Sequence, residues 1–220
     1  MMARREVMGT LLAGAGMLMA GCAFSGQPTY RFRMTVEIAT PQGLKTGSSV
    51  MEIVAYKESF VIGDRGGGHS GLGGEAVVVD LADGPVFALL HKESDNARDL
   101  HGEVTHALAP EASTHGDFDV FLAAVRRLGK ESGIKADLPR ADWPMMVRFR
   151  NLGDPKSVEK VDPDAIGVKR IRLETTSDPM TTGLEKRLGW LSAAENFQYQ
   201  GTRYSDLYPL PSMDFRSPAK

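Results

Sequence analysis

The feature that most constrains the fold is a stretch near the start of the chain in which apolar and polar residues alternate without exception. It covers residues 30–38 and reads Tyr-Arg-Phe-Arg-Met-Thr-Val-Glu-Ile. Successive side chains of a strand point to opposite faces, so Tyr30, Phe32, Met34, Val36 and Ile38 share one face. We therefore predict a strand that is buried on this face only.

The next segments predict that the sheet continues along the chain. Turn residues at 40–43 and a β-rich run at 49–57 predict that the first two strands form a hairpin. The glycine-rich residues 63–74 predict a mobile surface loop, and two further strands are expected at 75–81 and 86–90. All four strands are expected to be antiparallel and consecutive.

Helical spacing replaces the strand pattern after His91. Leu100, Val104 and Leu108 predict a first helix behind a possible N-cap at Ser94. A stronger apolar stripe predicts a second helix that begins at Asp117 and stops by Gly133.

The rest of the chain predicts two strands, a short helix and a tail. The strands are expected at 145–149 and 168–174, and the pattern Thr182-x-x-Glu185 predicts a capping box before the helix. We expect one α+β domain over residues 29–196, a mainly antiparallel sheet of about six strands with two or three helices packed on one face. The aromatic and proline-containing tail, 197–220, is expected to be partly disordered, with its first half docked on the domain.

The first 22 residues predict export from the cytoplasm. Arg4 and Arg5 precede an apolar run at 7–21 that is too short to span about 30 Å of hydrocarbon as a stable helix. The run ends in Leu-Met-Ala-Gly-Cys, which resembles the lipobox of bacterial lipoproteins, although Met19 stands where that family usually has Leu, Val or Ile. The resemblance implies a signal peptide at 1–21, acylation of Cys22 with fatty acids such as palmitate, and a lipidated linker at 22–28.

Two alternatives to this lipoprotein signal stay open. A general signal peptidase could cut near residues 20–22 and leave a soluble periplasmic protein, and the arginine pair also resembles a twin-arginine signal. We expect a lipid-anchored protein that faces the periplasm. The outer membrane is favoured, because Ala23 replaces the Asp that often retains lipoproteins at the inner membrane.

Charge and cysteine content exclude some classes of function. The chain has 26 Lys and Arg against 28 Asp and Glu and contains no basic block, so we expect no nucleic-acid partner. Cys22 is the single cysteine, so the chain cannot form an internal disulfide. Its membrane partner is therefore expected to be reached through the lipid on Cys22.

Three stretches together resemble an uncharacterised family of small bacterial exported proteins that includes lipoproteins. They are TPQGLKTGSSV at 40–50, GGEAVVVDLADGPVFALL at 73–90, and the segment from DPKSVEKVDPDAIGV to TTGLEKRLGWL within 154–191. The resemblance implies export but no activity, cofactor or catalytic residue. The chain departs from the family in its histidine-bearing glycine stretch and its aromatic tail.

Motifs that could carry chemistry have simpler structural explanations. Residues 66–71 contain G-x-G-x-x-G, but a strand rather than a helix is expected to follow, so no dinucleotide site is predicted. The last residues of this stretch also fail the nucleophile pattern G-x-S-x-G at Leu72. Ser48 and Ser49 could serve as a nucleophile or a phosphate-binding turn, and they are equally ordinary turn residues.

The histidines and acidic residues lack the spacing of a metal site. His91, His101, His106 and His115 lie close together in the sequence with Asp99 and Glu103, but His101 and His106 are five residues apart and do not share a helix face. We expect solvated or capping histidines and no metal. The acidic residues Asp154, Asp162, Asp164 and Asp178 lack the spacing of a calcium loop and predict turns and caps.

These observations favour a non-enzymatic envelope lipoprotein that acts as a binding or structural module. Its partner would be an envelope protein or the cell wall, with no cofactor, no catalytic residue, and Cys22 as the single site residue. An envelope enzyme, most plausibly a hydrolase, is the alternative. A deep polar pocket lined by carboxylates or histidines would favour the enzyme, whereas a shallow apolar face beside the tether would favour binding.

Overall fold

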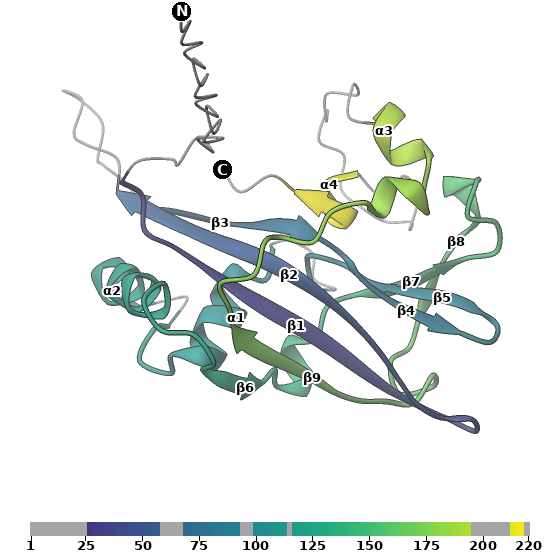
Figure 1. Cartoon of the computed structure of the whole chain (residues 1–220), viewed down its shortest axis with the longest axis horizontal. Coiled ribbons are helices and arrows are strands. Elements are labelled where there is room, and N and C mark those ends of the chain that lie inside the picture. The colour runs from purple at the N-terminus through teal and green to yellow at the C-terminus, as the bar shows by residue number, and fades with distance from the viewer. Residues whose placement is uncertain (1–25, 58–67, 93–98, 114–115, 195–211, 218–220) are drawn as a thin grey trace, which may run out of the picture.

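The computed structural model describes residues 26–57, 68–92, 99–113, 116–194 and 212–217. The described strands form two antiparallel sheets, one of six strands in the order β10-β3-β2-β1-β9-β6 and one of four in the order β4-β5-β7-β8 (Figure 1). Helices α1 and α2 pack on the six-stranded sheet, so the predicted α+β class is confirmed. The separation into two sheets was not predicted.

The element boundaries are as follows. The strands are β1 (Thr29–Thr40), β2 (Gly43–Lys57), β3 (Gly68–Glu75), β4 (Val77–Leu81), β5 (Gly84–Ala88), β6 (Lys135–Asp137), β7 (Met146–Phe149), β8 (Val158–Val161), β9 (Val168–Thr175) and β10 (Arg216–Ser217). The helices are α1 (His101–Leu108), α2 (Phe118–Leu128), α3 (Trp190–Ala194) and α4 (Ser212–Phe215), with short 3-10 turns η1 (Arg140–Asp142), η2 (Pro155–Ser157) and η3 (Leu184–Lys186).

The predicted hairpin of β1 and β2 is confirmed and forms the centre of the larger sheet. The two strands pair from Thr29 opposite Val54 to Thr40 opposite Gly43, and β9 pairs with the other edge of β1. The alternating apolar residues of β1 are buried in a first core, where they meet α1 and α2. Their polar neighbours form ion pairs on the opposite face, for example Arg31 with Glu52.

The second sheet begins where the chain leaves the first. Strand β3 passes through Ala76 into β4, and β4 crosses β2 so closely that a Cβ on Gly47 would lie 1.9 Å from the carbonyl oxygen of Val78. A glycine is therefore required at this crossing. The smaller sheet is covered on both faces: Val77 belongs to the first core, and Val78 packs on a second core. Burial on both faces explains the continuous apolar run of β4.

The prediction of a surface loop at 63–74 is wrong for its described part. Residues 68–75 form β3, which pairs with β2 from Gly68 opposite Lys57 to Gly73 opposite Glu52. A Cβ on Gly68 would lie 2.4 Å from the Phe118 ring, and a Cβ on Gly74 would lie 2.9 Å from Cγ of Met51, so neighbouring side chains occupy the space at these two glycines. Composition alone indicated flexibility, whereas close packing is the cause.

The two predicted helices are present on the first core. The Asp117 side chain accepts a hydrogen bond from the Asp119 amide and caps α2, as expected, although the helix ends at Leu128, before Gly133. Its buried stripe includes Phe121 and Val125. Helix α1 begins at His101 with Leu100 at the N-cap position, so the prediction of Ser94, which lies outside the described residues, as its N-cap is wrong.

The predicted capping box at Thr182 is wrong. Gly183 occupies the N-cap position of η3 and no side chain from this position caps the turn. Instead, the buried carboxylate of Glu75 accepts hydrogen bonds from the amides of Gly183 (3.1 Å) and Leu184 (2.9 Å). Glu75 lies more than a hundred residues away in sequence, so a local pattern could not identify it.

The second core lies between the smaller sheet and the C-terminal helices. Phe215 is fully buried there and its ring contacts Phe87, Phe149 and Trp190. The docked part of the tail is thus its second half, 212–217, and the predicted docking of the first half lies outside the described residues. Cys22 and the predicted export signal also lie outside them, and no described helix is long and apolar enough to cross a membrane.

Candidate functional site

The most unusual polar group in the described part of the chain is a histidine and carboxylate cluster next to the second core. His91 follows β5, and the backbone at His91 forms a bridge to Asp99 just before α1. Asp214 of α4 reaches the same place, where its backbone carbonyl oxygen accepts a hydrogen bond from the Leu90 amide. His91 and Asp99 are close in sequence, and the distant C-terminal segment brings Asp214 to them.

His91 and Asp214 form a buried pair. Nε2 of His91 lies 3.6 Å from Oδ1 of Asp214, and the two residues are only 5% and 8% exposed. Among the described residues, Nδ1 of His91 and Oδ2 of Asp214 have no hydrogen-bond partner. Burial raises the pKa of Asp214 to about 7. Burial also lowers the pKa of His91, while the charge of Asp99 acts in the opposite direction.

Asp99 and His101 form a second, more exposed pair at the start of α1. Oδ1 of Asp99 contacts Nδ1 of His101 and accepts from the His101 amide, while Oδ2 accepts from the Leu72 amide at 3.2 Å. Burial acts to raise the pKa of Asp99, but these contacts outweigh it and the pKa is lowered. Asp99 therefore fixes the orientation of His101 and accepts the first backbone amide of α1, while Leu100 occupies the N-cap position.

The expectation of solvated or capping histidines is wrong for His91, which is buried against Asp214. His106 is exposed and its ring contacts the carbonyl oxygen of Ala112, and His115 lies outside the described residues. Glu103 pairs with Lys92 rather than with a histidine. Within the described ranges, no three His, Cys, Asp or Glu side chains gather as metal ligands.

The two serines have separate structural surroundings. The Ser49 hydroxyl is buried and donates to the carbonyl oxygen of Glu75. Ser48 lies on the outer face of the hairpin, where its hydroxyl is 3.5 Å from Arg33. Neither serine contacts a histidine in the described part of the chain.

Asp154 and Asp162 form the predicted caps and turns, whereas Asp164 and Asp178 form surface ion pairs that were not predicted. Asp154 accepts from the Lys156 amide at the start of η2, and Asp162 accepts from the Asp164 amide. Asp164 pairs with Arg140, and Asp178 pairs with Arg33 across the hairpin face.

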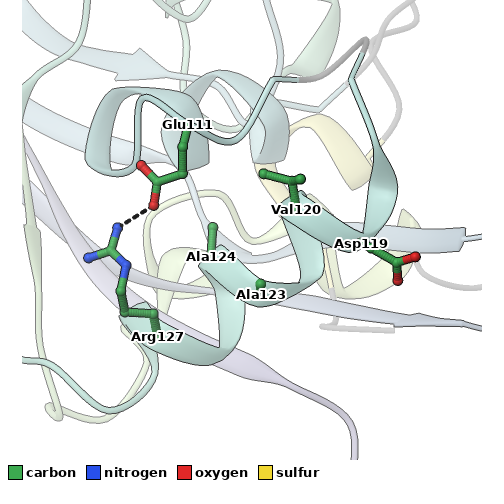
Figure 2. A pocket seen from close by; sticks show the side chains of 6 residues that line it. All are labelled: Glu111, Asp119, Val120, Ala123, Ala124 and Arg127. Carbon is green, nitrogen blue, oxygen red and sulfur yellow. Dashed lines mark hydrogen bonds and ion pairs between the residues drawn. The ribbon is translucent and has the colours of Figure 1, made fainter.

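A shallow depression runs along the outer side of α2 (Figure 2). Its volume is about 430 Å³ and its lining surface is almost entirely apolar, with Val120, Ala123 and Ala124 as the floor. Glu111 and Arg127 close one end with an ion pair of 2.8 Å, and Asp119 lies at the other end. Val120 is 41% exposed, so an apolar side chain is presented to solvent in this depression, which we call the α2 groove.

The α2 groove lies at the end of the domain where the described chain begins. The carbonyl oxygen of Pro28 accepts from the Ala55 amide near the end of β2, and Gly129, just after α2, packs against the carbonyl of Thr29. Asp119 in turn pairs with Lys57, the last residue of β2. The start of β1 and the groove therefore share one end of the molecule.

Sequence reasoning missed Asp214, Glu75 and the α2 groove. Asp214 and Glu75 act across long sequence separations, so no local periodicity marks them. Val120 interrupts the polar face of a strongly amphipathic helix, and this signal was available.

Comparisons with models of protein families, with curated proteins and with solved structures give no match to this chain. The resemblance to small exported proteins therefore stays a prediction. Inferences about function have to come from the residues of this chain.

Proposed function

We propose that this protein is a non-enzymatic lipoprotein of the bacterial cell envelope that binds an envelope partner at its tethered end. The observation that carries the proposal is the α2 groove, a shallow apolar surface at the end of the domain where β1 begins. Such a surface suits docking of another macromolecule better than enclosure of a small substrate.

The position of the groove relative to Cys22 supports this proposal. Cys22 precedes the first described residue, Gly26, by four residues. At about 3.6 Å per residue, the two Cα atoms are separated by at most about 14 Å. A lipid on Cys22 would therefore hold this end of the domain near the bilayer, and a partner in the groove would lie close to the membrane. The outer membrane is the favoured location.

The hydrolase is the second candidate, and Asp99 with His101 is the observation that favours it. A carboxylate that orients a histidine is part of many hydrolytic sites. However, no serine, threonine or cysteine side chain in the described part of the chain forms a hydrogen bond to the His101 ring. The α2 groove is apolar and lies away from His101 on the outer side of α2. A binding role is therefore favoured.

The lipid anchor is tested by labelling cells with a radioactive or clickable fatty acid. We expect the wild-type protein to take up label and to fractionate with the outer membrane, and Cys22→Ser to abolish both. An unlabelled wild-type protein in the soluble periplasm would contradict the anchor and favour the ordinary secretory signal.

The binding face is tested with a photo-crosslinking amino acid at one of two exposed apolar positions. Val120 lies in the groove, and Leu44, 57% exposed, lies at the far end of the β1 and β2 hairpin and serves as the matched control. We expect a discrete crosslinked product from position 120 that is lost when Ala123→Glu fills the groove with charge. Equal products from both positions, or a product insensitive to Ala123→Glu, would refute this face.

A further inference from the structure

The C-terminal segment 212–217 packs into the domain at a distance in sequence from the preceding described element, α3. Seventeen residues outside the described ranges lie between it and the end of α3. It adds β10 to the edge of β3 and places the Phe215 ring in the second core, 5.6 Å from Trp190. Two amides of the domain, those of Ala76 and Leu90, donate to its carbonyl oxygens.

The segment also inserts its carboxyl group beside a histidine. Asp214 and His91 are both buried and are 3.6 Å apart. If the pair holds one proton, its net charge is zero whichever residue carries it. If that proton leaves for solvent, a negative charge remains in a buried site, and burial of an uncompensated charge is strongly unfavourable.

Among the described residues, the other charged groups near the pair do not supply this compensation. Arg216 is the nearest cation on the segment, but it extends to Glu185 (3.1 Å) and Glu75 (3.9 Å). Lys92, next to His91, binds Glu103 and Asp142. Asp99 faces His91 with a negative charge, although His101 partly balances it.

From this geometry we propose that residues 212–217 form a detachable latch that stays docked while Asp214 and His91 share one proton and is released when that proton is lost. The negative charge of Asp99 lowers the free-energy cost of adding a second proton to the pair at His91. The latch therefore opens mainly when the pH rises and the shared proton is lost. This direction agrees with the effect of burial, which raises the pKa of Asp214 to about 7. The inference concerns the domain alone and does not depend on the proposed function.

Release of the latch would change the surface of the domain. The ring of Phe215 would leave Phe87, Phe149 and Trp190, and the edge of β3 at Gly74 and Glu75 would lose its partner strand. An unpaired edge beside an aromatic pocket can accept another extended segment. A rise in pH would thus expose a surface that the tail covers at neutral and mildly acidic pH.

Hydrogen exchange of three backbone amides tests the latch in residues 23–220, which retain every described element. The amides of Ala76 and Leu90 donate to the segment, whereas the neighbouring Leu89 amide donates to Met145 and is the internal control. Between about pH 6 and about pH 8.5 we expect the protection of Ala76 and Leu90, relative to Leu89, to fall about threefold to tenfold. Protection ratios constant within about twofold would overturn the proposal.

Two variants and one direct titration assign the effect. Asp214→Asn should abolish the pH dependence, while Asp178→Asn, an exposed carboxylate on the hairpin face, should leave it unchanged. If Asp214→Asn still shows the wild-type profile, the latch proposal is wrong. If Asp214→Asn fails to dock at any pH, carboxyl carbon NMR of the wild type decides: titration of Asp214 near its ordinary value of about 4 would refute the mechanism, and titration near neutrality would support it.

Discussion

Glu75 offers the sharpest test of how the second core is attached to the rest of the domain. Its carboxylate is 4% exposed and accepts the amides of Gly183 and Leu184 at the start of η3, with Arg216 nearby. Glu75→Gln preserves the shape, but its NH2 group must face one of these two amide donors. One charge-assisted hydrogen bond is lost and one buried donor is left unsatisfied, so we expect a loss of about 2–4 kcal/mol in the free energy of unfolding.

The assay is urea unfolding at neutral pH, followed by Trp190 fluorescence in a Trp143→Phe background. Glu185→Gln is the matched control, because it removes the partly exposed partner of Arg216 and should cost no more than about 1 kcal/mol. Exchange of the Gly183 and Leu184 amides should accelerate in Glu75→Gln only. Equal small losses for both variants would show that the carboxylate does not hold η3 and would refute the reasoning.

Three further predictions concern the first core and the crossing of the sheets. Phe32→Ala should lose about 3–5 kcal/mol in urea unfolding, whereas Arg33→Ala, which breaks a surface pair with Asp178, should lose at most about 1 kcal/mol; similar losses would contradict the two-faced strand. Gly47→Ala should cost about 3 kcal/mol or more because its Cβ meets the Val78 carbonyl, and Gly189→Ala, with open space around it, should be nearly neutral. Burial, only partly offset by the Thr105 hydrogen bond, raises the pKa of Tyr30. The neutral phenol therefore contributes its full stability below about pH 10, and this contribution is lost as the pH rises further. Tyr30→Phe should weaken this alkaline loss of stability in a pH series of thermal unfolding.

The sequence was sufficient to predict elements whose environment repeats along the chain. The alternation at 30–38 identified β1, and the apolar stripe after Asp117 identified α2 together with its cap. In both cases one face of the element packs on the same core over several residues, so the apolar periodicity predicts both the element and its buried face. The fold class follows from these elements and is confirmed by the structure.

The sequence was insufficient where a residue is determined by a distant neighbour. Gly68 was assigned to a loop because its composition resembles one, but the Phe118 ring from α2 is what excludes a side chain there. The pattern at Thr182 matched a capping box, but Glu75 supplies the carboxylate. Each error concerns a contact between segments that the sequence does not bring together.

The same limit applies to the site. The spacing of His101 and His106 predicted that they do not share a helix face, and in α1 the His101 ring contacts Asp99 while the His106 ring contacts the carbonyl oxygen of Ala112. Spacing could not indicate that His91 is buried, because its partner arrives from the tail. Asp214 lies in a segment without periodicity, so nothing in the local sequence marks it.

Two regions of the domain therefore have different relations to the proposed anchor. The α2 groove is fixed by a rigid helix at the end where β1 begins, so it is available whatever the state of the tail. The aromatic pocket around Phe87 and Trp190 is filled by Phe215 of the same chain, so access to it requires release of the tail. If both surfaces bind partners, only the second would respond to pH, because Asp214 is part of its occupant. A partner whose binding is equally strong at pH 6 and pH 8.5 would consequently be assigned to the groove, and one that binds only at the higher pH to the pocket.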